Sequence, residues 1–446
     1  MQLNPFQSKR VTPAKILVGG FALLIFIGAI LLSLPISART GRLPFLDALF
    51  TATSAVCVTG LVVVDTGTYF SRFGQTVIML LIQIGGLGIM TAATVLFILL
   101  GKKISLRERL VIKEAMNQIT MQGLVHLVQM VILLTLVVEF FGALILSTRF
   151  IPLYGFWTGL FYAVFHAISA FCNAGFDLIG GYRSLTPFSH DPVIVLTVAS
   201  LFILGGLGFT VILEFIQRRR YSRLTLHAKM VIGITALLLS LGTVVIFLME
   251  YHNPATLGQF GLFGKLMNAF FTAATPRTAG FNTLPTDGLF QPTLFFIIAL
   301  MFIGASPAST GGGIKTTTFG ALVVAVVSTV RGKEDALLFK KRIPVEILRR
   351  ALSITMISIL LVFIVAFGLM LTEGGELMDM LFEAMSAFGT VGLSTGVTTG
   401  LSPLGRILII MTMFTGRVGP LTLVFALARG MEKEPVKYTA ERILIG

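Results

Sequence analysis

The chain has 446 residues, of which 55% are hydrophobic and 12% are charged, and its formal net charge is +14. A soluble domain carries about 25% charged residues, so this chain lacks the polar surface that a water-soluble fold of its size needs. The composition therefore excludes a soluble enzyme, a disulfide-rich secreted scaffold and a disordered chain, and it indicates an integral membrane protein.

Eight apolar runs are each near the roughly 20 residues that cross about 30 Å of hydrocarbon. They predict an all-α membrane fold with spanning helices at 15–35, 76–100, 124–147, 193–216, 230–249, 293–330, 352–371 and 407–427. The first run is too long for the apolar part of a signal peptide, and no small-residue cleavage pattern follows it. We therefore interpret this run as the first helix.

Lysine and arginine are unevenly distributed between the segments that join these runs. The segments of one side, together with both termini, hold 24 of the 34 basic residues, whereas the segments of the opposite side hold 8. By the positive-inside rule, this asymmetry predicts that both termini lie in the cytoplasm. We expect a multi-pass protein of the cell (plasma) membrane. The asymmetry also explains the positive net charge without a nucleic-acid partner.

A motif recurs four times, once after each odd-numbered run. An apolar stretch of about a dozen residues ends in a glycine (Gly60, Gly175, Gly280 and Gly392), which Leu or Phe follows. A serine lies six positions before the glycine in three copies, and Ala274 takes its place in the third. The recurrence predicts four tandem repeats, at 1–100, 101–217, 218–330 and 331–446, the last of which includes a cytoplasmic tail.

Each of these stretches is about 18 Å long as a helix, which is half a membrane. We expect each repeat to contain a spanning helix, a re-entrant pore half-helix (a P-loop of the channel type), an extended glycine segment and a second spanning helix. Non-helical backbone at membrane depth is tolerated only where it is buried in protein or lines a watery cavity. Four such segments therefore predict a pore on a pseudo-fourfold axis.

Stacked carbonyl oxygens in such a pore would replace the hydration shell of a monovalent cation. The C-terminal ends of the half-helices would add negative partial charge. The two residues before each glycine include no acid, so selectivity would come from the backbone. The alternative is that the four glycines only end interfacial helices and pack helix against helix.

The four glycine-ended half-helices resemble those of the Trk/Ktr/HKT superfamily of cation transporters. The closest resemblance is to the membrane-embedded potassium-translocating subunit of a bacterial Ktr potassium uptake system, and it covers essentially the whole chain. The resemblance implies gated potassium uptake and no enzyme activity. It also implies K⁺ as the substrate and no tightly or covalently bound cofactor, with stimulation by Na⁺ left open. A serine at the position of Gly60 accompanies sodium preference in plant relatives, so Gly60 favours potassium.

The resemblance also implies which residues contact the ion, through their backbone. The candidate selectivity filter is Val58, Thr59, Gly60, Leu61, Asn173, Ala174, Gly175, Phe176, Thr278, Ala279, Gly280, Phe281, Thr390, Val391, Gly392 and Leu393. We expect no metal site other than potassium at this filter.

The second helix of the third repeat contains an unusual polar stretch between Gly304 and Thr316. Its proline and its three consecutive glycines would disrupt a helix. A flexible loop here can obstruct a pore below the filter, and the resemblance implies an intramembrane loop at this place. Ile314 separates Gly313 from Lys315, so the stretch does not match a nucleotide-binding loop.

Arg417 lies 25 residues after its filter glycine, and Gly304 lies 24 residues after its own, so we expect both at a similar depth. Because an intramembrane charge is costly, Arg417 is a functional candidate that would donate hydrogen bonds to loop carbonyls and hold a gate shut. The alternative is that its side chain snorkels to the cytoplasmic edge, and the same alternative is open for Lys315. The candidate gate residues are Gly304, Ser306, Pro307, Ser309, Thr310, Gly311, Gly312, Gly313, Lys315, Thr316 and Arg417.

No segment between the runs is long enough for a sensor domain, since the longest basic one, 331–350, has about 20 residues. A gated pore without a sensor points to a separate regulatory subunit. The resemblance implies a cytosolic, octameric, nucleotide-binding ring as this partner, and a homodimer of the chain in membrane lipid. Residues 432–446 are a candidate dimer contact.

Two other classes of function stay open. One is a sodium-coupled or sodium-selective cation symporter of the same architecture. The other is an intramembrane enzyme, which the scarcity of acids at membrane depth disfavours. Among single residues, we expect His166 to be a packed side chain, Glu383 to attract cations and Glu214 to pair with a nearby arginine.

Overall fold

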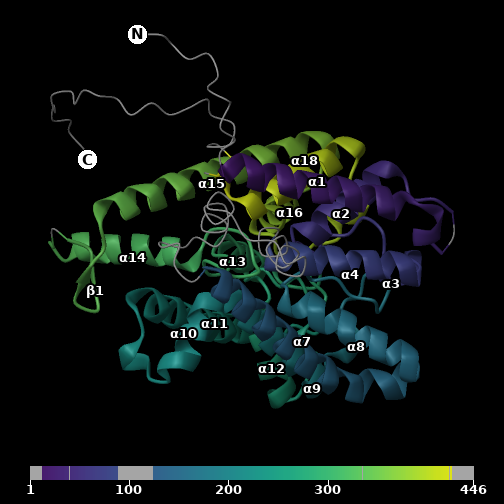
Figure 1. Ribbon diagram of the computed structural model, residues 1–446, viewed down its shortest axis with the longest axis horizontal. Helices are drawn as coiled ribbons and strands as arrows, with labels where there is room; N and C mark the ends of the chain where they lie inside the picture. Colours follow the sequence, from purple (N-terminus) through teal and green to yellow (C-terminus); the bar gives the residue numbers. More distant parts are fainter. Residues whose placement is uncertain (1–12, 40, 89–123, 334, 421, 424–446) are drawn as a thin grey trace, which may run out of the picture.

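The computed structural model describes residues 13–39, 41–88, 124–333, 335–420 and 422–423, and this part of the chain is almost entirely helical (Figure 1). Each repeat contains one long helix. These helices are α1 (Pro13–Ser33), α7 (Leu124–Tyr154), α11 (Leu226–Glu250) and α15 (Val345–Glu373). All four are long and apolar enough to cross a membrane.

A shorter helix follows each long one and packs closely against it. The four half-helices are α2 (Phe45–Val56), α8 (Phe156–Phe171), α12 (Leu262–Ala274) and α16 (Leu377–Gly389). They have 12 to 16 residues, and each ends a few residues before the glycine of its motif. The chain leaves the helical path through residues with positive φ (Val58, Asn173, Thr278 and Thr390), two positions before each glycine.

The second helices of the repeats are short or broken. They are α4 (Arg72–Leu87), α9 (Pro192–Leu207) with α10 (Phe209–Arg218), α13 (Gln291–Phe302) with α14 (Thr316–Val330), and α18 (Pro403–Val418). The expected unbroken span at 193–216 is wrong, because α9 and α10 meet at Gly208 with a 94° bend. The second run, 76–100, continues beyond the described residues after Gly88. Within the described part, four helices are long enough to span, or five if the bent pair forms one span.

An interrupted second helix is therefore not special to the third repeat. Gly88, Gly208 and Gly419 each follow the helix with a φ near +90°, a left-handed conformation that favours glycine. The remaining elements are short connectors, and two strands form an antiparallel hairpin that pairs Leu337 with Arg342. They are η1 (Pro35–Ser37), α3 (Thr66–Tyr69), η2 (Thr186–Phe188), η3 (Tyr221–Arg223), η4 (Leu257–Gln259), α17 (Val397–Gly400), β1 (Leu337–Leu338) and β2 (Lys341–Arg342).

The four repeats contact one another in a closed order. The second helix of each repeat packs against the half-helix of the next, in the pairs α4 with α8, α9 with α12, α13 with α16, and α18 with α2. An ion pair between Arg406 on α18 and Asp47 on α2 joins the last repeat to the first. In Figure 1, α1, α2, α15, α16 and α18 lie above α7, α8, α9, α11 and α12, and α4 lies between them at the level of α13 and α14.

Large apolar side chains cover the outside of the long helices. Phe140 on α7 and Phe367 on α15 are each 64% exposed, and many leucines and isoleucines on these helices are similarly bare. A surface of this kind and extent is stable in hydrocarbon and not in water. The expectation of an integral membrane protein is thus confirmed.

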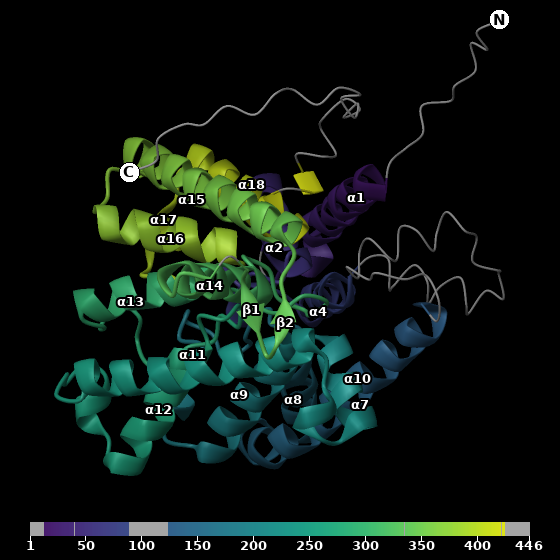
Figure 2. The ribbon, with the colours of Figure 1, turned by 90° about the vertical axis from the view of Figure 1, so that its left-hand side faces the viewer.

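Two basic segments, 218–229 and 331–342, lie close to each other on the side of the molecule that faces the viewer in Figure 2, around α10 and the β1–β2 hairpin. The ammonium of Lys229, at the start of α11, lies 5.7 Å from the ring centre of Phe339 in the hairpin. Both segments carry the excess of basic residues that predicts one and the same side of the membrane, and this contact agrees with that prediction.

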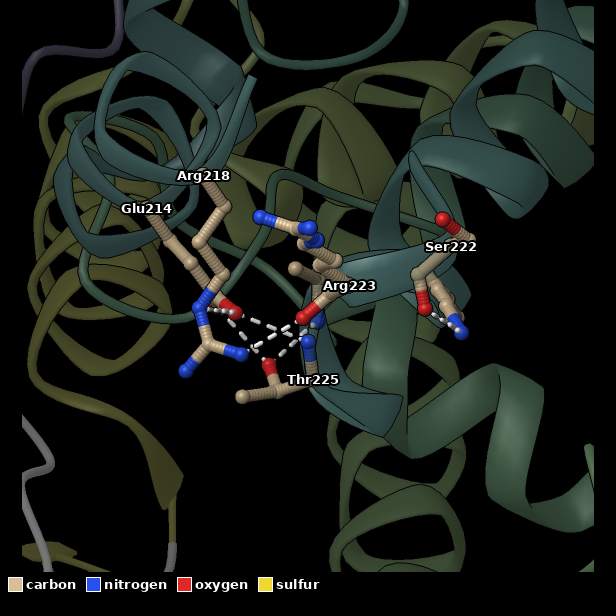
Figure 3. Close-up of polar contacts among 7 residues, drawn as sticks. Glu214, Arg218, Ser222, Arg223 and Thr225 are labelled. Carbon is tan, nitrogen blue, oxygen red and sulfur yellow. Dashed lines mark hydrogen bonds and ion pairs between the residues drawn. The ribbon is translucent and has the colours of Figure 1, made fainter. Parts of the chain in front are cut away.

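The predicted ion pair of Glu214 is confirmed next to the first of these segments (Figure 3). Its carboxylate lies 3.1 Å from Nε of Arg218. The same carboxylate accepts hydrogen bonds of 2.8 Å from the backbone N–H and the hydroxyl of Thr225, the residue that caps α11. Glu214 therefore fixes the turn that joins the second repeat to the third.

Candidate functional site

The ends of the four half-helices are held by hydroxyl side chains. In repeats 1, 2 and 4, the N–H of the residue before the filter glycine donates a 2.8 Å hydrogen bond to the carbonyl of the serine at the −6 position. The Ser54 hydroxyl accepts a hydrogen bond from the Gly60 N–H at 3.0 Å, and the Ser169 hydroxyl donates one to the Phe176 carbonyl at 2.7 Å. Each hairpin is therefore tied to its own helix.

The third repeat preserves this arrangement with a shifted residue. Ala274 at the −6 position has no hydroxyl, but Thr275, one residue later, donates a 2.6 Å hydrogen bond to the Phe281 carbonyl. Its own carbonyl accepts the N–H of Ala279 at 2.9 Å. Alignment on the glycine missed Thr275, and the adjacent hydroxyl was the only signal that could have identified it.

The filter glycines adopt a left-handed conformation in every repeat. Their φ values are +92° for Gly60, +69° for Gly175, +78° for Gly280 and +94° for Gly392. The residues two positions earlier (Val58, Asn173, Thr278 and Thr390) also have positive φ, between 50° and 71°. A β-branched residue with positive φ is strained, and such strain persists only where the surroundings enforce it. The same unusual backbone is therefore built four times.

The four glycines also adjoin one another in a closed cycle. A Cβ added to Gly60 would lie 3.1 Å from Cα of Gly175. One added to Gly175 would lie 2.9 Å from Cα of Gly280, and one added to Gly280 would lie 3.4 Å from Cα of Gly392. A Cβ at Gly392 would lie 3.0 Å from Cα of Gly60, which completes the cycle. No side chain fits at any of these positions without displacing a neighbouring backbone.

Carbonyl oxygens of the residue before each glycine lie at these same contacts. The Cβ of a substituted Gly60 would meet the Ala174 oxygen at 2.6 Å, and that of a substituted Gly175 would meet the Ala279 oxygen at 3.0 Å. In the same way, a Cβ at Gly280 would meet the Val391 oxygen, and a Cβ at Gly392 would meet the Thr59 oxygen. Four carbonyl oxygens, one from each repeat, therefore gather where the glycines meet.

The stretch between Gly304 and Thr316 forms a non-helical loop between α13 and α14. Its base is closed by a parallel bridge, in which the Gly304 N–H donates to the Ile314 carbonyl at 2.9 Å. Ser306, Thr310 and Thr316 are fully buried. Lys315 does not extend away from the loop, because its Nζ donates a 2.7 Å hydrogen bond to the Gly311 carbonyl.

The loop contacts three of the four filter strands at the residue two positions before the glycine. The Thr310 hydroxyl lies 3.0 Å from Oδ1 of Asn173, and the Gly312 N–H donates to the Thr390 hydroxyl at 3.1 Å. Gly311 packs so closely on Thr278 that a Cβ would collide with its side chain. The loop thus lies against three of the four strands.

Arg417, at the end of α18, contacts this loop and the first repeat together. Its guanidinium donates hydrogen bonds to the carbonyls of Thr310, Gly85 and Gly86, the last at 3.3 Å. The side chain therefore connects the loop of repeat 3 to the last turn of α4 in repeat 1. The gate role of Arg417 stays a prediction, as do the gate roles of the loop residues.

The loop also explains the break between α9 and α10. The Phe209 N–H, which a continuous helix would bond internally, donates to the Ala308 carbonyl at 2.8 Å. The Ser306 N–H in turn donates to the Gly206 carbonyl at 3.0 Å. Backbone groups that are freed by the break are thus satisfied by the loop, as membrane interiors require.

Glu383 and His166 are both buried behind the filter strands. The Glu383 carboxylate accepts hydrogen bonds from Ser394 and Thr398 and is 0% exposed, so it does not face an open vestibule as a cation attractor would. His166 is packed among aromatic rings, which confirms the expectation for that residue. Among the described residues, no cluster of three or more His, Cys, Asp or Glu side chains could hold a metal ion.

Helical repeats that enclose gathered carbonyl oxygens, in a fold with an apolar outer surface, are typical of membrane proteins that transport cations. Residues 12–436 match the family model TrkH, described as cation transport protein. The chain belongs to this family and is a transporter, not an enzyme.

Several individual proteins resemble the chain over nearly its full length. It is 46% identical to the "Ktr system potassium uptake protein B" of Bacillus subtilis (strain 168), over 98% of this chain and 97% of that protein. It is 39% identical to the "Potassium/sodium uptake protein NtpJ" of Enterococcus hirae, over 98% of both chains. The solved structure of the potassium transporter TrkH from Vibrio parahaemolyticus has the same fold, with a TM-score of 0.73 and 18% identity over 96% of this chain and 87% of that one.

Proposed function

We propose that the protein mediates gated potassium uptake across the cell membrane. The ion passes through a filter formed by the backbone of 58–61, 173–176, 278–281 and 390–393, arranged about a pseudo-fourfold axis. Together with the four long helices, the second segments of the four repeats would make eight crossings of the membrane. Carbonyl oxygens replace the hydration shell of the ion, and no carboxylate is needed in the filter.

The observation that carries this proposal is the closed cycle of glycines with one neighbouring carbonyl oxygen at each contact. Glycines that merely ended interfacial helices would have no reason to meet in all four repeats. The half-helices end at this place, so their C-terminal dipoles, each equivalent to about −0.5 charge, favour a cation there. Potassium is proposed as the ion because the relatives are named for potassium uptake.

The loop at 304–316 acts as the gate in this proposal, and Arg417 holds it closed. The support is that the loop lies against three filter strands and that Arg417 bonds both the loop and α4. A positive guanidinium beneath the filter also repels a cation that leaves it. Opening requires the loop to move aside, and its three consecutive glycines permit this.

We further propose that the chain works as a homodimer in lipid with a cytosolic, nucleotide-binding regulatory ring. Two of the relatives are named as proteins of a "Ktr system", which fits more than one component. The basic loops around Lys229 and Phe339 would face the cytoplasm and meet this partner, and both termini would lie on the same side. The proposed dimer contact at 432–446 falls outside the described residues.

Uptake by the purified protein in liposomes tests the function. We expect rubidium, a tracer for potassium, to enter proteoliposomes and potassium to compete with it, while a tenfold excess of sodium has little effect. Equal competition by sodium and potassium would refute a potassium filter.

A second candidate function is sodium-coupled or sodium-selective transport. The observation that favours it is the name of the Enterococcus hirae relative, which includes sodium as well as potassium. Measuring rubidium uptake with and without sodium distinguishes the two, because a coupled transporter requires sodium for every turnover. A conductor that sodium only stimulates retains uptake in its absence.

A further inference from the structure

The position nine residues before each filter glycine is buried in all four repeats but is chemically different in each. It is Thr51 in repeat 1, His166 in repeat 2, Phe271 in repeat 3 and Glu383 in repeat 4, and every one of these side chains is 0% exposed. All four lie on the half-helices, behind the filter. In the closed order of the repeats, 2 and 4 are opposite one another, as are 1 and 3.

Glu383 bonds the segment that follows the filter of repeat 4. One carboxylate oxygen accepts the hydroxyl of Ser394, two residues after Gly392. The other accepts the hydroxyl of Thr398 at 2.9 Å. The side chain therefore reaches past the filter strand and fixes its outer end to the half-helix.

His166 makes the equivalent connection in repeat 2 with different chemistry. Its Nδ1 lies 2.7 Å from the carbonyl of Tyr162, one turn earlier, so this nitrogen carries the proton and donates. Nε2 is then free to accept the N–H of Leu178, three residues after Gly175, at 3.4 Å. The neutral imidazole thus links the half-helix to the outer end of its filter strand, as Glu383 does on the opposite side.

The same position makes no such connection in the other two repeats. The Thr51 hydroxyl donates to the carbonyl of Asp47 within its own helix, at 2.9 Å. Phe271 packs on Phe202, with ring centres 5.4 Å apart. The segments after these two filter strands are bonded to the second repeat instead, through Asp65, which accepts the N–H of Tyr182, and Asn282, whose N–H donates to Ser184.

We propose that His166 and Glu383 are positioning residues that determine ion specificity by holding two opposite filter strands from behind. The inference rests on the proposed potassium filter. Discrimination between potassium and the smaller sodium ion depends on how closely the carbonyl oxygens can approach the ion and how freely they move. Two opposite strands with fixed outer ends keep the ring of oxygens from contracting around sodium.

The test compares isosteric variants at this one position. Glu383→Leu and His166→Phe remove the acceptors and keep approximate volume, whereas Thr51→Val removes a hydroxyl that bonds only its own helix. His166→Phe removes one hydrogen bond to the segment after the filter, and Glu383→Leu removes two. We expect each variant to lower the ratio of rubidium to sodium uptake in proteoliposomes by at least about fivefold, the factor that corresponds to about 1 kcal/mol for one lost hydrogen bond. We expect Thr51→Val to leave the ratio unchanged.

Further variants separate positioning from folding. Ser394→Ala removes a donor to Glu383 without altering a half-helix, so it should shift the ratio in the same direction even if Glu383→Leu does not fold. Glu383→Gln retains one acceptor oxygen and should lie between Glu383→Leu and the wild type. Lower melting temperatures with an unchanged ratio in all of these variants would overturn the inference. A wild-type protein that does not discriminate would instead refute the proposed filter itself.

Discussion

Removal of the Arg417 guanidinium should open the proposed gate. In the structure, this group donates hydrogen bonds to three carbonyls, of Thr310, Gly85 and Gly86, which belong to two different repeats. A hydrogen bond from a charged donor contributes about 1.5–3 kcal/mol. Loss of two such bonds would remove at least about 3 kcal/mol from the closed state. The ratio of closed to open protein would then fall by more than about a hundredfold.

The assay is the initial rate of rubidium uptake by Arg417→Ala in proteoliposomes with matched protein content. Arg406→Ala is the matched control, since Arg406 lies on the same helix but bonds Asp47 and the Leu401 carbonyl, far from the loop. We expect a large rate increase for Arg417→Ala and none for Arg406→Ala. Arg417→Lys retains the charge without the forked donor geometry and should give an intermediate rate. An unchanged rate for a folded Arg417→Ala protein would refute the gate role and leave these hydrogen bonds with a purely structural part.

Three further predictions concern glycines. Deletion of Gly311–Gly313 should shorten the loop and withdraw it from the filter strands. We expect rubidium uptake to rise at least about tenfold, a change equivalent to about 1.4 kcal/mol. Equal or lower uptake by a folded protein would argue against a gate. Gly60 has a φ of +92°, and Gly60→Ser would place a Cβ 2.6 Å from the Ala174 oxygen. We expect this substitution to reduce the preference for rubidium over sodium. Unchanged competition curves would show that Gly60 is not part of the filter. Gly205→Ala drives a methyl group into the Phe171 carbonyl and should lower stability by about 1–3 kcal/mol, measured as a reduced melting temperature in detergent. Gly233, which has no atoms within 4 Å of an added Cβ, is the control position for both substitutions.

Features encoded by neighbouring residues could be predicted from the sequence. The half-helices follow from a dozen apolar residues that end in glycine, and they appear in all four repeats with the expected length. The long helices follow from runs near the thickness of the bilayer. The ion pair of Glu214 with Arg218 follows from their spacing of one helical turn.

Features that depend on distant partners could not be predicted. The break at Gly208 occurs within a continuous apolar run, and its freed Phe209 N–H is satisfied by Ala308 from another repeat. Because that partner lies a hundred residues later in the chain, no local pattern reveals it. The contact of Arg417 with Gly85 and Gly86 likewise depends on the closure of repeat 4 onto repeat 1. The depth of Arg417 in the membrane could be inferred by counting residues from Gly392. The carbonyl groups that accept its hydrogen bonds could not be inferred in this way.

Glu383, the buried acid of the fourth half-helix, shows a different limit of prediction from sequence. Glu383 was expected to attract cations, because a carboxylate near a cation path ordinarily does so. Its two oxygens are instead used by Ser394 and Thr398, which follow it by 11 and 15 residues. The hydroxyls are visible in the sequence, but only the turn of the chain through the filter brings them to the carboxylate.

The position of the ion itself tests the central claim most directly. Crystals or membranes of the protein prepared in rubidium or thallium salts allow the heavy ion to be located by anomalous diffraction or by difference density. The account predicts peaks on the line enclosed by Gly60, Gly175, Gly280 and Gly392, at carbonyl coordination distance from all four repeats. Heavy-ion density found only elsewhere, with this space unoccupied at saturating salt, would contradict it.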